Sequence, residues 1–460
     1  IIFFLISISL IIYKPHDDFS YYHFQYTYYL TQFPMIIGVG QFNHGFATPS
    51  SIFYLNSIFF LPLAKYSLFH ISAFLVFGFS NIILIKKLLK YLKKNRPNYL
   101  SFFLLLSIAF INIIFYRLAE HGTDRSAQIL IFILVFELII LLNDRKFLDN
   151  SLSKIFILLS LIVSFKAFYI LYFIFLFPVI IYGYSKLKLN LIFTIIKNKC
   201  FFLLTITFLI IIFTNFFNSG CFLFPVKLTC FENLSWAFSL DHVSHMNNWY
   251  EQWSKAGAGP NFRVENPEEY ILFFNWFSNW IDQYFFNKVY DFLLGLVAII
   301  IIFYLFFCSS RNQNTITRDK IFPIYLCLSI LFFEWLYNHP SLRYGGYVLV
   351  GILIFIPSSI ILSRFSKNNI KNRFKIILAI IFIVFFSRNV ERINEEIEKY
   401  GYEPFKNAHY RFDDSYFRIN EEFKYLLNNY YLCKKSNQCD ENTDIKIGKT
   451  FGKLYFENEQ

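Results

Sequence analysis

Apolar residues recur along the first 388 positions in long blocks, and short polar stretches separate one block from the next. An 18-residue α-helix is about 27 Å long, close to the roughly 30 Å hydrocarbon core of a bilayer. Most blocks are long enough to cross a membrane, so the pattern predicts an all-α, polytopic transmembrane helical bundle. The expected spans are residues 1–13, 68–85, 99–116, 127–143, 155–165, 168–184, 200–217, 290–308, 321–337, 347–363 and 375–388.

The composition agrees with a membrane protein. Hydrophobic residues make up 56% of the 460 positions and charged residues only 16%, against about 25% in an average soluble domain. We expect the bundle over residues 1–388 and a polar, extracytoplasmic segment over residues 389–460. Since the chain begins at Ile1 without an initiator Met, the start of the first helix is expected to be missing, with a cleaved signal peptide as the alternative.

The net charge of +12 raises the question of nucleic-acid binding, but the basic residues gather in short loops between the apolar blocks. Short basic loops mark the cytoplasmic side of a membrane and contact anionic lipid headgroups. We therefore expect membrane lipid, and no nucleic acid, as a partner. The basic clusters run from Lys86 to Arg96, Arg145 to Lys154, Lys186 to Lys199, Arg311 to Lys320 and Arg364 to Lys375.

With these loops inside, we expect the amino end on the cytoplasmic side and the carboxyl end on the outer side of the membrane. The outer segments are residues 14–67, 218–289 and 389–460. Four of the seven cysteines fall in these segments as two close pairs, the arrangement that disulfides in an oxidising compartment require. The pairs are Cys221 with Cys230 and Cys433 with Cys439.

The stretch from Ile155 to Tyr184 has basic loops at both ends, which favours two short helices over one long helix. The outer turn between them brings Lys166 to the membrane surface, where a buried ammonium needs an anionic partner. The alternative is a lysine whose long side chain simply reaches water.

Two consecutive carboxylates, Asp17 and Asp18, follow the first expected span. Aromatic and apolar residues from Phe19 to Phe33 then recur at the spacing of an amphipathic helix in the membrane interface. Neighbouring residues on a helix cannot point the same way, so one carboxylate is expected to cap the helix and the other to be free. A free carboxylate can act as a general base or a metal ligand, whereas the alternative is that both are caps.

A second outer turn, between the third and fourth spans, is dense in ionisable groups and contains Glu120, His121 and Asp124. In the predicted topology this turn lies on the same side as Asp17, so the two segments can meet over the bundle. The alternative is a solvated turn in which Asp124 caps the next helix.

Arg343 lies in a short outer turn between the ninth and tenth spans. Its planar guanidinium could donate two parallel hydrogen bonds to phosphate oxygens. The alternative is an ordinary arginine on the outer surface.

The 218–289 loop carries His242, His245 and Trp249. His242 and Trp249 are candidates for contacts with an acceptor or a sugar, because aromatic rings beside polar groups can stack on sugar rings. The other candidates for such contacts are His23, His44, Glu120 and His121. An aromatic belt at the membrane interface is the alternative. Two histidines with no third ligand are a weak metal pattern.

Four of these features together resemble the GT-C superfamily of polytopic membrane glycosyltransferases, which take sugars from polyprenyl-phosphate carriers. They are Asp17-Asp18 after the first span, Thr123-Asp124 at the start of the fourth, Lys166 in a short helical hairpin and Arg343-Tyr344 in a late outer turn. The likeness covers residues 1–185 best. The chain is also similar to a largely uncharacterised branch of bacterial integral membrane proteins.

The resemblance implies an inverting transfer of a hexose or pentose to a cell-envelope glycan or lipid. Asp17 would be the general base, and Asp18 or Asp124 would orient it or hold a divalent cation, Mg²⁺ or Mn²⁺. Lys166, Arg343 and Tyr344 would bind the donor phosphate, on which negative charge grows.

Two other functions are considered beside this one. An enzyme similar to O-antigen ligases or polymerases would use His242, His245 and Arg263 of the large outer loop. A transporter of lipid-linked glycans would line a continuous path through the spans with polar residues, whereas here such residues gather at the outer ends.

Overall fold

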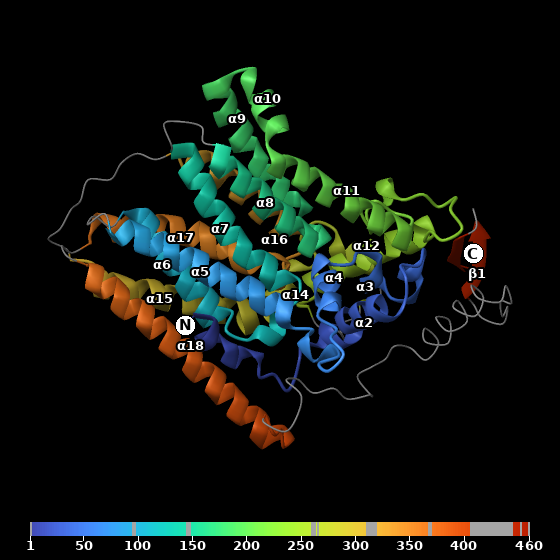
Figure 1. Cartoon of the computed structure of the whole chain (residues 1–460), viewed down its shortest axis with the longest axis horizontal. Helices are drawn as coiled ribbons and strands as arrows, with labels where there is room; N and C mark the ends of the chain where they lie inside the picture. The colour runs from blue at the N-terminus through green and yellow to red at the C-terminus, as the bar shows by residue number, and fades with distance from the viewer. Residues whose placement is uncertain are drawn as a thin grey trace.

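The structure, a computed structural model, describes residues 2–93, 98–143, 149–258, 264, 266–309, 320–366, 370–404, 445–450 and 453–458. Figure 1 shows a helical bundle from which α9 and α10 project, with a small group of helices from the amino-terminal part beyond one end. Through residue 187 the elements are α1 (Ile2–Ile6), η1 (Ser7–Leu10), η2 (Phe19–His23), α2 (Phe24–Gln32), η3 (Val39–Phe42), α3 (His44–Ala47), α4 (Ser51–Ile58), η4 (Tyr66–Leu68), α5 (Ile71–Lys93), α6 (Tyr99–Ala109), η5 (Phe110–Ile114), η6 (Leu118–Glu120), α7 (Asp124–Asn143), α8 (Asp149–Phe165), η7 (Ala167–Phe175) and α9 (Leu176–Leu187).

The rest of the described chain is also helical until the carboxyl end, and η2, η5 and η9 are π-helical while the other η elements are 3₁₀. The remaining elements are α10 (Asn190–Lys197), α11 (Lys199–Ser219), η8 (Lys227–Thr229), α12 (Leu240–Lys255), α13 (Pro267–Ile271), α14 (Phe277–Trp280), η9 (Ile281–Val289), α15 (Tyr290–Phe307), α16 (Phe322–Asn338), η10 (Leu342–Tyr344), α17 (Gly346–Arg364), α18 (Lys371–Tyr400), β1 (Ile445–Thr450) and β2 (Lys453–Asn458).

Within the described residues, six helices are long and apolar enough to cross a membrane. Two shorter apolar helices, Tyr99–Ile114 and Phe322–Asn338, match further predicted spans, whereas residues 1–13 contain only the short elements α1 and η1. The count of eleven spans therefore stays a prediction. The six helices are Tyr66–Lys93, Asp124–Asn143, Ala167–Leu187, Lys199–Ser219, Phe277–Phe307 and Gly346–Arg364.

Helix α7 forms the centre of the bundle, because it is apolar on all sides and nearly every residue from Ala127 to Leu142 is buried. Helices α5, α6, α8 and α17 pack around it. In contrast, α11 is equally apolar but leaves most of its side chains uncovered, as expected of a helix that faces lipid.

The predicted basic-loop ends of several helices meet at the Asn143 end of α7. The amide of Lys320, before α16, donates to the Asn143 side chain at 2.7 Å, and the amide of Ser309, after α15, donates to the Phe365 carbonyl after α17 at 2.9 Å. Which compartment this Asn143 end faces stays a prediction. Nearby, buried Glu137 forms ion pairs with Lys87 and Lys154, so its partners are lysines of two predicted basic clusters.

Lys166 interrupts the helical path where two short helices were expected. Helix α8 ends at Phe165, Lys166 has an extended backbone (φ −157°, ψ 133°), and η7 begins at Ala167. The prediction of two helices with Lys166 between them is confirmed.

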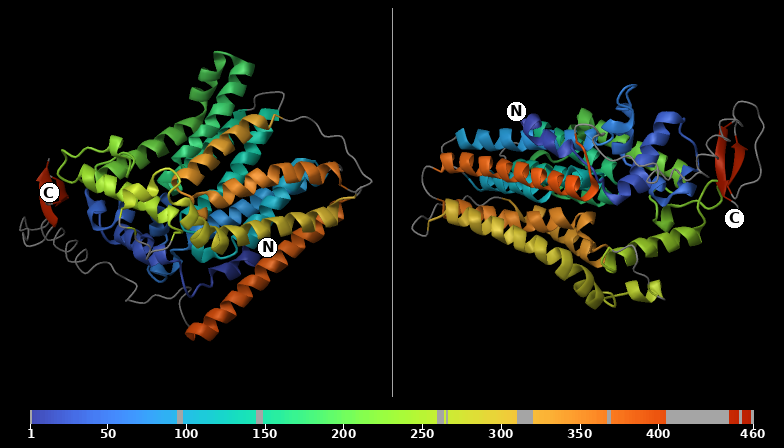
Figure 2. Two further views of the ribbon diagram at one scale, coloured as in Figure 1. Left: turned by 180° about the vertical axis from the view of Figure 1, so that it is seen from behind. Right: turned by 90° about the horizontal axis from the view of Figure 1, so that it is seen from below.

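The expected boundary at residue 388 falls inside α18, so the helix runs 12 residues, 389–400, into the segment expected as a polar tail. The helix continues to Tyr400 along one side of the bundle and extends beyond it (Figure 2). It contacts α1 and η1 of the amino-terminal segment. Arg392 donates to Glu396 at 2.9 Å and to the Ile11 carbonyl at 2.7 Å, and Glu396 accepts from the Tyr13 amide at 3.0 Å.

Near the carboxyl end, β1 and β2 form an antiparallel hairpin in which Ile445 pairs with Asn458 and Thr450 with Lys453. The bundle is helical, as predicted, and this hairpin lies within the polar 389–460 segment. In β1 the apolar residues Ile445 and Ile447 alternate with a lysine and a glycine, a period-2 pattern that favours β-structure over helix.

Candidate functional site

The two consecutive carboxylates lie on different sides of the helix, as helical geometry requires. The Asp17 side chain is 87% exposed and lies 3.6 Å from the Lys14 ammonium. The Asp18 side chain is only 21% exposed and forms an ion pair with Arg343, 325 residues later in the chain. Asp18, rather than the predicted Asp17, therefore faces the interior, and neither is held as a side-chain cap of η2.

Asp124 lies at the amino end of α7 and joins the same group. Its carboxylate is 2.6 Å from the Lys166 ammonium and 3.6 Å from the Arg343 guanidinium. We call Asp18, Asp124, Lys166 and Arg343 the charged cluster. Two acids and two bases balance, which lowers the cost of holding four partly buried charges together.

The turn that carries Arg343 is fixed by aromatic side chains. Trp280 donates to the Pro340 carbonyl at 2.9 Å, and Trp335 donates to the Ser341 carbonyl at 2.8 Å. The Tyr284 hydroxyl accepts from the Leu342 amide at 2.9 Å, and Gln128 of α7 donates to the Arg343 carbonyl at 2.8 Å. Gly345 closes the turn with φ 98°, a conformation that favours glycine.

Aromatic rings cover the cations of the charged cluster. The Lys166 ammonium is 4.7 Å from the centre of the Tyr344 ring. The Arg343 guanidinium is 5.5 Å from both the Tyr344 ring and the Trp253 ring. Such contacts stabilise a desolvated cation. From the sequence, Tyr344 is expected at the site, whereas Trp253 and Trp280 of the 218–289 loop are interpreted first as an interfacial belt. Trp335 lies within a predicted span, where an aromatic residue gives no signal of a site.

Burial and charge act in opposite directions on the ionisable groups here. Burial raises the pKa of Asp18, but the charge and hydrogen bond of Arg343, together with His23 and His16, outweigh burial and hold the pKa well below its ordinary value. Burial lowers the pKa of Lys166, and Asp124 beside it opposes that shift. Asp18 is therefore an ionised carboxylate whose charge depends on the neighbouring cation of Arg343.

His23 lies beside the charged cluster, and burial lowers its pKa to about 3, so the imidazole is neutral at physiological pH. Its ring fills the space over Gly122, where a Cβ atom would lie 2.7 Å from the His23 Cε1 atom. His121 is buried elsewhere, with Nε2 2.5 Å from the Phe115 carbonyl oxygen.

Glu120 belongs to a separate ion-pair group. It pairs with Arg125 and lies 3.5 Å from Arg117, rather than contacting the charged cluster. Among the predicted residues of the second outer turn, the structure thus brings Asp124, but not Glu120 or His121, into the cluster.

The large outer loop approaches the site through α12. His44 of the first outer loop contacts the Trp249 ring, with centroids 5.7 Å apart. His242 instead stacks on Phe238 at 4.6 Å, away from the cluster. Arg263, a residue of the alternative ligase hypothesis, lies outside the described residues.

Cys221 and Cys230 form a disulfide, as predicted, in the segment that leads into α12. Cys433 and Cys439 lie outside the described residues. In the described part of the chain, no three His, Cys, Asp or Glu side chains are arranged as metal ligands. The exposed Asp17 lies on a different side of its helix from Asp18, and a divalent cation held by Asp17, Asp18 or Asp124 stays a prediction.

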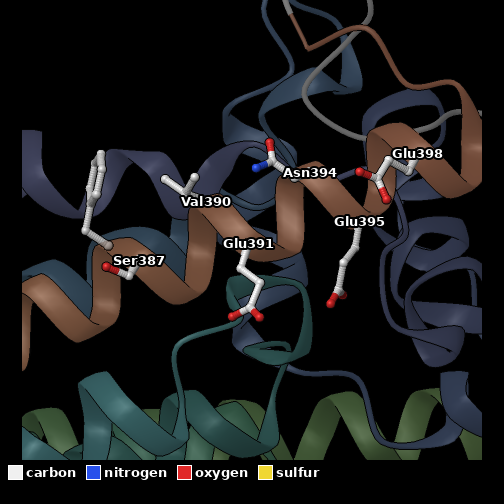
Figure 3. A pocket seen from close by; sticks show the side chains of 7 residues that line it. Ser387, Val390, Glu391, Asn394, Glu395 and Glu398 are labelled. Atoms are coloured by element: carbon white, nitrogen blue, oxygen red, sulfur yellow. The ribbon is translucent and has the colours of Figure 1, made fainter.

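A pocket along α18 lies apart from these residues. Glu391 and Glu395 are four residues apart and point to the same side of the helix (Figure 3). The pocket is lined by Phe386, Ser387, Val390, Glu391, Asn394, Glu395 and Glu398, none of which is a predicted site residue.

No match was found among curated proteins or among solved structures. A protein-family model, described as a domain of unknown function (DUF8201), matches residues 1–350. This match includes all four residues of the charged cluster and the turn that holds Arg343. Because it covers well over half of the 460 residues, the chain belongs to the DUF8201 family.

Proposed function

We propose that this protein is a membrane glycosyltransferase of the GT-C type, which moves a sugar from a polyprenyl-phosphate carrier to a cell-envelope acceptor on the extracytoplasmic face. The observation that carries the proposal is the charged cluster. Two carboxylates and two cations from four distant segments meet at the Asp124 end of apolar helices. A lipid-anchored sugar phosphate needs these groups beside the membrane.

Lys166 and Arg343 suit the donor phosphate. A guanidinium binds phosphate through two parallel hydrogen bonds, and an ammonium adds a compact charge. As the bond between the anomeric carbon and the phosphate oxygen breaks, negative charge grows on the phosphate, and both cations stabilise it. Asp124, paired with both of them, orients them for this task.

Asp18 takes the role that the sequence alone gave to Asp17, because Asp17 points to solvent. A donor phosphate competes with Asp18 for Arg343, and a carboxylate that loses this partner becomes more basic. Asp18 then accepts the proton of the acceptor hydroxyl. The acceptor oxygen bonds to the anomeric carbon with inversion, and the polyprenyl phosphate leaves with the electron pair of the broken bond.

The proposed orientation follows the positive-inside rule. The Asn143 end of α7, near which the predicted basic loops meet, faces the cytoplasm, and the charged cluster faces the periplasm of a bacterial inner membrane. Labelling of a single cysteine introduced at position 17 in intact cells, with a reagent that does not cross the membrane, tests this orientation.

The test of function compares Asp18→Asn with its neighbour Asp17→Asn in cells that lack the chromosomal copy. Surface glycans and carrier lipids are measured by mass spectrometry. We expect wild type and Asp17→Asn to restore the missing sugar, and Asp18→Asn to lower transfer by about 10²- to 10⁴-fold while the sugar carrier accumulates. Addition of EDTA to the reconstituted protein tests the divalent cation that was predicted beside Asp18 and Asp124.

Full transfer by Asp18→Asn at equal protein level contradicts the proposal. If substitutions of His242 and His245 abolish transfer while Asp18→Asn does not, the ligase hypothesis is favoured. If the glycan structures are unchanged but movement of the carrier across the membrane is altered, the protein is a transporter.

A further inference from the structure

A series of aromatic side chains leads away from the charged cluster along α12. The Trp253 ring lies 5.8 Å from Tyr344, and Trp249, one helical turn earlier, lies 5.7 Å from His44. His44 lies 5.5 Å from Tyr21, whose ring is 51% exposed. We call Tyr21, His44, Trp249, Trp253 and Tyr344 the aromatic strip. It joins the first outer loop, α12 and the Arg343 turn.

Helix α12 holds this strip from a fixed position. At its amino end, Val243 is buried in a small core with Cys221 and Phe224, next to the Cys221–Cys230 disulfide. At its carboxyl end, the buried Lys255 ammonium donates to the Ile271 carbonyl at 2.7 Å. The strip therefore does not depend on a free loop for its position.

The rings of the aromatic strip are not fully buried, and the helix that carries two of them is not apolar. Trp249 and Trp253 are partly exposed. The same helix carries Asn247, Asn248 and Glu251, and it lies outside the six apolar helices. Aromatic residues of an interfacial belt lie at the ends of apolar, membrane-spanning helices. These rings instead belong to a polar helix next to the charged cluster.

Flat aromatic faces next to carboxylates and amides suit a sugar ring. The rings pack against the carbon-bound hydrogens of the sugar, and the polar groups bind its hydroxyls. We propose that the aromatic strip is an acceptor subsite that binds a glycan. This proposal rests on the proposed function and deepens it, because it makes the acceptor a carbohydrate rather than a simple lipid or a polypeptide.

The position of the aromatic strip indicates that it binds the acceptor rather than the donor. The donor phosphate is assigned to Lys166 and Arg343, and its prenyl chain must remain among the apolar helices. The strip runs from Arg343 in the other direction, toward polar α12 and the exposed ring of Tyr21. A glycan seated there would direct a hydroxyl group toward Asp18, which is the partner of Arg343.

The test measures glycan binding by the full chain in lipid nanodiscs, without any transfer step. The probes are soluble oligosaccharides built from hexoses, N-acetylhexosamines, deoxyhexoses or pentoses, and binding is followed by microscale thermophoresis. An aromatic contact worth about 1.4 kcal/mol corresponds to a tenfold change in affinity. Trp249→Ala and Trp253→Ala should each raise the Kd about tenfold, and Trp249→Phe should restore most of the affinity.

Phe231→Ala is the matched control, because Phe231 is an exposed ring of the same outer loop that packs on Phe216 and Phe222, away from the strip. It should leave the Kd unchanged. Asp18→Asn should bind the oligosaccharide and fail only in transfer, so the binding result separates this inference from the proposed function. Loss of binding in Trp249→Ala with full transfer by Asp18→Asn would support the strip and reject the mechanism.

Three results overturn the inference. The first is that no oligosaccharide in the panel binds to the wild-type protein. The second is that both alanine variants bind as tightly as wild type. The third is that Phe231→Ala weakens binding as much as Trp249→Ala, which would indicate a general loss of structure in the outer loop.

Discussion

Replacing Arg343 with methionine tests whether Asp18 is an ionised carboxylate held by one guanidinium. The substitution keeps the aliphatic bulk and removes the cation that pairs with Asp18. Removing one partner of a fully buried pair costs about 3–5 kcal/mol. Because the two side chains are 21% and 25% exposed, solvent reduces this cost, and we expect about 2 kcal/mol. The corresponding fall in Tm is about 2–4 °C.

The pH dependence of stability distinguishes the Arg343→Met variant from the wild type more sharply than the Tm at a single pH. In the wild type the pKa of Asp18 is lower in the folded state than in the unfolded state. Ionised Asp18 therefore stabilises the folded protein at pH values above its unfolded-state pKa, and this stabilisation is lost as the pH falls through its folded-state pKa. Without Arg343, burial is the dominant effect and raises the pKa of Asp18 above the unfolded value. The variant should therefore gain stability, relative to wild type, as pH is lowered from about 7 to about 4.5.

The assay follows tryptophan fluorescence during thermal unfolding in nanodiscs, at a series of pH values. His16, His23 and His44 also face Asp18, and their contribution is removed by comparison with the double variant Arg343→Met/Asp18→Asn. That double variant should lack the gain at low pH. Tm curves for Arg343→Met and wild type that run parallel from pH 7 to pH 4.5 would refute the view that Arg343 keeps Asp18 ionised.

Two further predictions concern the segments that bring the site together. Gly122→Ala places a Cβ atom 2.7 Å from the His23 Cε1 atom, so it should cost about 1–3 kcal/mol and lower the Tm and the transfer rate, whereas Gly295→Ala, with open space around it, should not. An unchanged Tm would mean that His23 moves aside freely. The Cys221–Cys230 bond joins positions nine residues apart, so its complete reduction should cost about 2.5 kcal/mol and weaken oligosaccharide binding. Full binding after reduction, verified by a shift in gel mobility, would show that α12 does not need the disulfide.

The helical bundle could be predicted because its signal is local and repeated. Apolar blocks of membrane length contained the long helices, and the basic residues at both ends of the 155–184 stretch indicated the break at Lys166. The partner of Lys166 could not be read from its own neighbourhood. Asp124 lies 42 positions earlier, and only packing of α8 against α7 brings the two charges to 2.6 Å.

The choice between Asp17 and Asp18 shows a different limit. Two consecutive carboxylates on a helix indicate that one can face inward. Which of the two does so depends on how the helix is rotated about its axis. That rotation is fixed by contacts such as Tyr22 against Gly45, where a Cβ atom would lie 2.4 Å from the Tyr22 ring. Such a contact joins two positions 23 residues apart, and neither position signals it alone.

The carboxyl-terminal half of α18 shows how a segment expected to be a separate tail becomes part of the scaffold of the site. Arg392 and Glu396 bind the backbone of residues 11–13, a few positions before Asp18. Asn389 donates to the Tyr116 carbonyl at 3.3 Å, at the start of the turn that leads to Asp124. Both acid-bearing segments are therefore anchored to one rigid helix. Each of these hydrogen bonds joins a side chain of α18 to a backbone group of another segment. Because every residue has a backbone, the amino acid type at the partner position does not indicate the contact. A division of the chain by polarity alone therefore separates α18 from the site that it supports.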